Sequence, residues 1–244
     1  MFSEGHLDIL RQGVAAWNKW RKNNPDTEPD LRWADLNIAS LNRVNFSKTD
    51  LSGASLSGAY LGGANLIGAD LSGAYLRGAN LNGASFRLAN LSRARLGKAN
   101  LSKANFCKAN LIGVYLKQAD LSEADLSMSY LRRAKLNETN LSKAKLIKAN
   151  LREANLSEAD LTEADLTEAD LCEANLSEAN LTKANLTKVN LTGAYLQGAN
   201  LENTIIRDAY PIPEWIFQGL NSDGIYTQEH LIETIRNDTK RNHK

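Results

Sequence analysis

Residues 158–171 read EADLTEADLTEADL, an acidic run with a period of five. Carboxylates in such an array could bind a divalent cation, imitate the phosphates of DNA, or only solvate the surface of a repeat. A calcium site needs six to eight oxygen ligands that converge on one ion. Side chains that point outward from a flat, regular surface diverge, and the run lacks the glycine-rich pattern of calcium-binding nonapeptide repeats. We therefore expect no metal site here.

Groups suited to catalysis are scarce in the rest of the sequence. The three histidines, His6, His230 and His243, lie near the ends of the chain, so none can act as a base along its length. The phosphate-binding pattern GxxxxGKS/T, the dinucleotide-binding pattern GxGxxG after a strand and the zinc-binding pattern HExxH do not occur. The sequence predicts a protein that is not an enzyme and that uses no cofactor.

The composition is that of an ordinary soluble protein. Of 244 residues, 43% are apolar and 23% are charged, and the net charge is +1. A chain this close to neutral is neither a polyanion nor a general nucleic-acid binder. No apolar run reaches the roughly 20 residues of a membrane helix, and the first residues, MFSEGHLDIL, do not resemble a signal peptide. We expect a cytoplasmic protein that does not enter a membrane.

The elements that position these side chains follow from a repeat. Leucine recurs at every fifth position from Leu31 to residue 206, in 36 consecutive pentapeptides, and is replaced only at Phe46, Phe86, Phe106 and Ile206. Alanine lies two residues earlier in 28 of the repeats. A helix would scatter a period of five around its surface, and a continuous strand would send successive leucines to opposite faces. A short extended A-x-L segment followed by a two-residue turn puts every Ala and Leu inside a winding coil.

This tandem A(D/N)LXX pattern resembles the pentapeptide repeat family over residues 29–208. The resemblance implies an all-β solenoid, a right-handed quadrilateral β-helix of about nine coils with four pentapeptides per coil. The chain then divides into an N-terminal capping helix and linker at 1–28, the β-helix at 29–208, and a C-terminal helical cap with a basic tail at 209–244. Cys107 and Cys172 fall about three coils apart, beyond the ~7 Å limit of a disulfide, so we expect free thiols.

The open ends of a solenoid need caps. A helix over residues 3–22, N-capped by Ser3, provides one, and a helix from Pro213 followed by a second helix after Thr227 provides the other. The segment AWNKW at 16–20 resembles N-terminal helices of cyanobacterial members of the family. Four aromatic side chains either pack in these caps or form a dimer or docking interface: Trp17, Trp20, Trp215 and Phe217.

Residues twenty apart should stack, so the exposed charges sort into columns. At the second position after each Leu, two columns alternate in sign, one from Lys103 to Lys183 and one from Lys148 to Lys188. The other two columns stack like charges and predict an acidic wall, either a solvated surface or a binding surface. Its residues are Glu138, Glu153, Glu158, Asp160, Asp170, Glu173 and Glu178.

Two further stripes are candidate contacts. One alternates aromatic and cationic residues, which suits cation–π stacking, protein docking or a contact with nucleic acid: Tyr75, Arg95, Tyr115 and Lys135. The other is an apolar strip on the side that carries the three core phenylalanines: Ile67, Leu88, Cys107, Met128 and Ile147. Either stripe is also compatible with a surface that binds nothing.

Three functions are compatible with the sequence. The first is a non-enzymatic scaffold or regulatory rod that binds another protein, as a monomer or as a homodimer through a cap, with nucleic acid and membrane disfavoured as partners. The resemblance implies the second, because some pentapeptide repeat proteins are DNA mimics that bind DNA gyrase and are linked to quinolone resistance. The third is a purely structural role. The net charge of +1 and the basic residues at 93–108 depart from the broadly acidic sides of the mimics.

Overall fold

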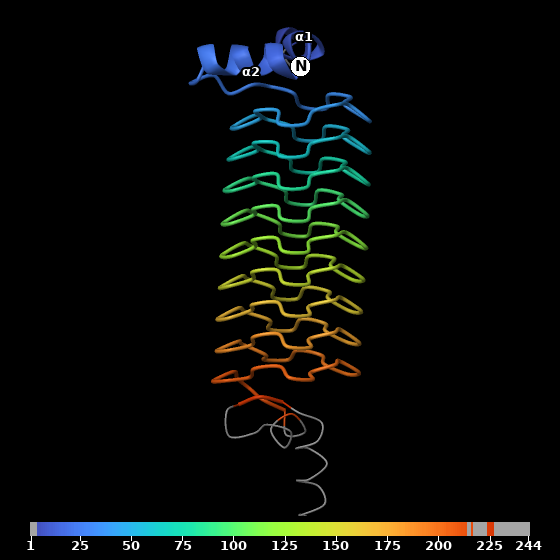
Figure 1. Cartoon of the computed structure of the whole chain (residues 1–244), viewed down its shortest axis with the longest axis vertical. Helices are drawn as coiled ribbons and strands as arrows, with labels where there is room; N and C mark the ends of the chain where they lie inside the picture. Colours follow the sequence, from blue (N-terminus) through green and yellow to red (C-terminus); the bar gives the residue numbers. More distant parts are fainter. Residues whose placement is uncertain (1–3, 214–215, 217–223, 227–244) are drawn as a thin grey trace, which may run out of the picture.

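The computed structural model describes residues 4–213, 216 and 224–226. Two short helices lie at one end, and below them the chain winds into a long stack of flat, closely similar coils (Figure 1). Coil follows coil without an inserted loop from residue 30 to residue 210. The stack is what an uninterrupted pentapeptide repeat predicts.

Backbone bridges fix the register of the stack. From Asp30 to Asn190, each residue that precedes a core Leu or Phe forms a parallel bridge with the residue twenty positions later. The Leu31 amide donates to the carbonyl of Asp50 at 2.8 Å, and the Asp50 amide donates to the carbonyl of Pro29 at 2.8 Å. Four pentapeptides therefore make one coil. Within residues 30–210 these are isolated bridges rather than strands of several residues.

Twenty residues per coil give the stack four sides. We number each side by its first inward residue, which is repeated every twenty residues. Side 1 begins with Leu31, side 2 with Leu36, side 3 with Leu41 and side 4 with Phe46. The Ala and Leu positions point inward and are almost fully buried on all four sides, at roughly 2 kcal/mol for each buried Leu.

Each pentapeptide turns in the same way. The carbonyl of the core Leu accepts a hydrogen bond from the Ala amide three residues later, as in Ala34 to Leu31 at 3.1 Å. The second residue after Leu has a positive φ, which is the conformation that a type II turn requires. Glycine suits it at Gly53 (φ 66°), but Lys98 (φ 60°) and Glu158 (φ 58°) adopt it as well. The repeat pattern alone did not predict this constraint, although glycine at every such position from 53 to 83 is its signal.

The phenylalanines of side 4 add an aromatic segment to the leucine core. The rings of Phe86 and Phe106 are fully buried, lie 4.6 Å apart and are nearly parallel, with an interplanar angle of 4°. Polar residues replace Ala at a few inward positions; Ser129, Thr139 and Thr204 donate to nearby carbonyls, whereas the buried Thr49 hydroxyl has no hydrogen-bond partner among the described residues. The Thr139 hydroxyl donates to the carbonyl of Leu116 at 3.0 Å.

The N-terminal segment forms two helices, so the prediction of one helix over 3–22 is wrong. Helix α1 spans Glu4–Arg11 and α2 spans Val14–Asn23. Gly13, between them, has φ 101°, a conformation that interrupts a right-handed helix and that glycine adopts readily. The predicted capping residue Ser3 lies outside the described residues.

Helix α2 packs across the first coil. Trp17 is fully buried, its ring lies 5.5 Å from Phe46, and its indole N–H donates to the Asn45 carbonyl at 2.8 Å. The Asn18 side-chain oxygen accepts from the Asn45 amide at 2.8 Å. Elsewhere in the stack, the backbone of the preceding coil forms the corresponding hydrogen bonds. Here the side chains of Trp17 and Asn18 take its place. Half-buried Trp20 lies 5.3 Å from Trp17 in the same cap.

At the other end, the segment 224–226 lies against the last coil. Ile225 forms an antiparallel bridge with Ile205, and the Ile206 amide donates to the carbonyl of Gly224 at 2.7 Å. Ile216 is buried. The predicted C-terminal helices, with Trp215 and Phe217, lie outside the described residues.

Candidate interaction surfaces

Side 1 carries a shallow hollow of about 670 Å³ near the N-terminal end of the stack. It forms because Gly53 and Gly73 have no side chain, whereas Trp33 and Arg93 project from the same column in the coils on either side. Trp33 is 71% exposed, and its ring lies over Gly53 in the hollow. A Cβ placed on Gly53 would be only 2.2 Å from the ring atom Cζ3. Ile112 extends the hollow toward the C-terminal end.

Neither Trp33 nor this hollow was predicted from the sequence. The available signal was a tryptophan at an outward turn position, above two glycines in its own column. Tryptophan, tyrosine and arginine are the residue types that dominate binding energy at protein interfaces. The hollow brings together one of each: Trp33, Tyr75 and Arg93.

The aromatic and cationic stripe borders this hollow through Tyr75. The Arg95 guanidinium lies over the Tyr75 ring at 5.1 Å, a cation–π contact of the predicted kind. Tyr115 and Lys135 follow in the same column through backbone bridges. Within the described chain, no cation–π contact joins these last two side chains, and both are exposed.

The acidic wall is interrupted by arginine and lysine, so the prediction of like charges without relief is wrong for several members. Glu153 accepts from Arg132 and Arg133, each at 2.6 Å. These arginines hold the pKa of Glu153 below its usual range, Arg133 most strongly. Asp170 pairs with Arg152 at 3.4 Å.

Glu138 is paired in the same manner. The Lys117 ammonium lies 2.7 Å from its carboxylate, and the Gln118 amide donates to it at 2.6 Å. Both contacts lower the pKa of Glu138, the bond from Lys117 most strongly. Arg132, Lys117 and Arg152 all occupy the first position after Leu, whereas the predicted charge columns contain residues at the second position.

The rest of the wall differs from residue to residue. Asp160 accepts bonds from the Thr162 amide and hydroxyl, so it stabilises its own turn. Glu158, Glu173 and Glu178 are exposed and have no ion-pair partner within residues 4–213. The acidic surface is therefore smaller than the sequence predicts.

Sides 3 and 4 show the charge alternation that the columns predict. Lys103 lies 3.9 Å from Glu123, and Lys143 lies 3.9 Å from Glu163. On side 4, Lys148 lies 3.3 Å from Glu168. These pairs are exposed and each contributes a few tenths of a kcal/mol at most.

The predicted apolar strip on side 4 is exposed at two points only. Leu88 is 60% exposed and Met128 is 42% exposed, whereas Ile67, Cys107 and Ile147 are half-buried. The strip is thus a pair of separated side chains rather than a continuous patch. Both cysteines are free.

Charge is segregated along the axis, although the net charge conceals it. Residues 71–119 contain no carboxylate, and residues 153–178 contain nine carboxylates and no lysine or arginine. The basic segment has eight cationic side chains: Arg77, Arg87, Arg93, Arg95, Lys98, Lys103, Lys108 and Lys117.

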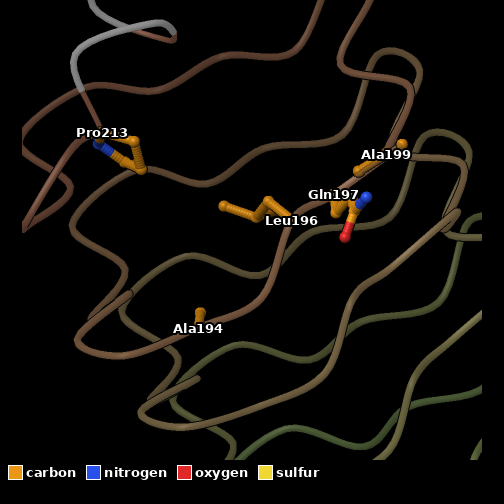
Figure 2. A pocket seen from close by; sticks show the side chains of 6 residues that line it. Ala194, Leu196, Gln197, Ala199 and Pro213 are labelled. Carbon is orange, nitrogen blue, oxygen red and sulfur yellow. The ribbon is translucent and has the colours of Figure 1, made fainter.

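A second hollow, of about 470 Å³, lies beside the last coils. Figure 2 shows Pro213 facing Leu196 across it, with Gln197 and Ala199 at the other edge. Among the described lining residues, Gln197 is the one with a polar side chain. Across the described ranges, no three His, Cys, Asp or Glu side chains cluster in a way that could hold a metal ion. No described helix is long and apolar enough to cross a membrane.

These features define a solenoid of five-residue repeats. The chain belongs to the pentapeptide repeat family. The family model for pentapeptide repeats matches in eight copies, at residues 30–68, 54–93, 89–127, 99–137, 124–162, 134–171 and 164–203 among them.

Solved structures of the same family resemble this chain. HetL, a pentapeptide repeat protein involved in heterocyst differentiation regulation in the cyanobacterium Nostoc sp. strain PCC 7120, is 36% identical, with a TM-score of 0.58 over 80% of this chain and 86% of HetL. QnrB1, a plasmid-mediated fluoroquinolone resistance protein, is 21% identical, with a TM-score of 0.38 over 76% of this chain and 96% of QnrB1. Comparison with curated proteins gives no match.

Proposed function

We propose that this protein is a non-enzymatic scaffold or regulatory rod that binds another protein through side 1. The observation that carries the proposal is the hollow with Trp33, Tyr75 and Arg93. An exposed indole on a rigid, closely hydrogen-bonded surface loses little conformational entropy when a partner covers it. HetL, which is described as acting in regulation, supports a regulatory role for a related rod.

Site-specific crosslinking tests this proposal. A photoreactive amino acid at position 33 should crosslink one protein in native extract. The same residue at position 183, an exposed turn position on side 3, should not crosslink it. With the captured protein purified, Trp33→Ala should weaken binding by at least about tenfold, as expected for a central aromatic contact. Identical crosslinked proteins from positions 33 and 183, or unchanged affinity in the Trp33 variant, would contradict it.

A second candidate function is a DNA mimic that modulates DNA gyrase. Glu158, Glu173 and Glu178 support it, because they are exposed carboxylates in neighbouring coils. The basic segment at 71–119 and the paired carboxylates Glu138 and Glu153 weigh against it. A supercoiling assay separates the two functions: no effect on gyrase at micromolar protein would reject the mimic. A purely structural role would give no specific crosslink at position 33.

We further propose that the protein acts in the cytoplasm. Its free thiols, Cys107 and Cys172, support this location, because reducing compartments keep thiols unoxidised. Cell fractionation with an antibody against the chain tests the location. Recovery in an oxidising compartment would reject it.

The remaining elements of the fold prediction are also proposals: a right-handed, quadrilateral coil, about nine coils in all, and a helical cap at each end. The twenty-residue register from residue 30 to residue 210 supports the coil number. Helices α1 and α2 support the N-terminal cap. A crystal structure of the full chain tests all of these elements.

A further inference from the structure

Side 2 differs from sides 3 and 4 because most of its charges are separated along the axis rather than alternated. From residue 75 onward its N-terminal half presents Arg77, Arg95, Lys98 and Lys117, and its C-terminal half presents Lys135, Glu138, Glu158 and Glu178; of these, Lys117 and Glu138 pair with each other at 2.7 Å. On side 3, by contrast, lysine and glutamate pair from coil to coil. Side 2 therefore has the larger unbalanced field at each of its ends.

The key charges of side 2 are available for an external partner. Lys98 and Glu158 lie in the same column, three coils apart, and both are exposed. Lys98 is flanked in its column by Gly78 and Gln118, so no carboxylate lies directly above or below it. Neither Lys98 nor Glu158 forms an ion pair within the described residues. Tyr115, 50% exposed, lies between these two charges along the axis.

We propose that side 2 binds a second copy of this chain, side by side and antiparallel. A two-fold axis that lies in the interface and perpendicular to both rods reverses the order of the coils but leaves each column facing itself. With this axis between the coils of Gln118 and Glu138, Lys98 faces the partner subunit's Glu158. The same contact occurs a second time by symmetry.

The remaining contacts in this register are also compatible. Tyr115 faces Lys135 of the partner subunit, a cation–π pair. Gln118 donates one amide N–H to Glu138 of its own chain, and its second N–H faces Glu138 of the partner subunit, which can accept it. At the ends of the contact, Gly78 faces the partner subunit's Glu178, with Arg77 beside it. No column places two like charges opposite each other.

Neighbouring registers are less favourable, so the charges select one arrangement. Moving the axis half a coil toward the C-terminus places Lys135 opposite the partner's Lys135, and Glu138 opposite the partner's Glu138. Moving it half a coil toward the N-terminus places Arg95 opposite the partner's Lys135. Like charges in contact across an interface are unfavourable.

The expected dimer is weak and salt-sensitive. Three outward columns over six coils supply about 18 side chains from each copy, slightly below the 20–30 of a standard interface. The central contacts are exposed charges, which bind modestly and are screened by salt. We expect a dissociation constant of roughly 1–100 µM at low ionic strength.

Sedimentation and light scattering of the full chain test the proposal. The wild type should shift from one chain of 26.8 kDa toward twice that mass as its concentration rises through this range, and salt near 0.5 M should reverse the shift. Lys98→Glu alone and Glu158→Lys alone should each remain monomeric. Their equimolar mixture should regain the dimer, because each unlike pair then restores two opposite-charge contacts.

The matched control is Lys108→Glu, which reverses an exposed charge at the same turn position two pentapeptides after Lys98, on side 4. It should dimerise like the wild type. A wild type that is monomeric throughout the concentration range would overturn the proposal. A dimer that persists in Lys98→Glu would also overturn the proposal, because a dimer through a cap would behave in this way. So would an equimolar mixture of the two variants that remains monomeric. The crosslinking test on side 1 is independent of all these results.

Discussion

Removing the buried tryptophan of the cap should unravel one end of the rod and leave the rest intact. The perturbation is Trp17→Ala. Trp17 is fully buried, contacts Phe46 at 5.5 Å and donates to the Asn45 carbonyl at 2.8 Å. Truncating a buried tryptophan to alanine costs about 3–5 kcal/mol.

This loss should be local because each coil contacts only its neighbours. In a solenoid, stability is approximately a sum of repeat and nearest-neighbour terms. The first coil loses its cap, whereas the coils around residues 151–171 keep both neighbours. A loss of about 3 kcal/mol in the local opening free energy accelerates amide exchange by about 100-fold.

Hydrogen exchange resolved by peptide is the appropriate assay. In Trp17→Ala, the Leu31, Leu36 and Phe46 amides should exchange about 100-fold faster, and those of residues 151–171 should be unchanged. Trp33→Ala is the matched control, since Trp33 is 71% exposed and should change stability by at most about 0.5 kcal/mol. Equal acceleration in all coils, or equal effects of the two variants, would refute the nearest-neighbour reasoning.

Two further predictions concern the turns and the first coil. Gly73→Ala should lower the free energy of unfolding by about 1 kcal/mol, because alanine is strained at a φ of 65°. No atom lies within 4 Å of the new Cβ, so a steric clash does not contribute to this loss. Gly97 has no positive φ, so Gly97→Ala should be neutral or slightly stabilising in thermal melts. The hydrogen bond from Arg32 lowers the pKa of Asp30 to about 2. Because the pKa of Asp30 is lower in the folded than in the unfolded chain, its interaction with Arg32 contributes about 1 kcal/mol to the free energy of unfolding above about pH 4. This contribution is lost as the pH falls through about 2. NMR titration should place Asp30 near 2 in the wild type and near 4 in Arg32→Ala, and an unchanged value in that variant would contradict the assignment.

The fold was predictable because its pattern is one-dimensional. An unbroken period of five fixes which residues point inward, and a fixed number of pentapeptides per coil fixes which residues stack. The alignment of Phe86 with Phe106 on side 4 follows directly from this count, and their rings do stack. The alternation of Lys143 with Glu163 follows in the same way.

The helical boundaries and the cap contacts were less accessible. The 3/4 spacing of apolar residues continues through Gly13, so periodicity alone predicts one helix. The break depends on the approach of α2 to the first coil, where Trp17 and Asn18 bond to the backbone of Asn45. No sequence pattern marks a side chain that replaces a missing backbone partner.

By itself, the sequence determined the period, the inward positions and the order of residues along each column. Only the tertiary structure decided which charges are free and where the surface is hollow. Glu153 is neutralised by Arg133, its neighbour in the column, and also by Arg132, a diagonal neighbour, because a long side chain reaches across columns. Trp33 lies over Gly53 because its ring can fold down where the next coil has no side chain. Both outcomes depend on rotamers and on contacts between coils, and a repeat pattern read along one dimension contains neither.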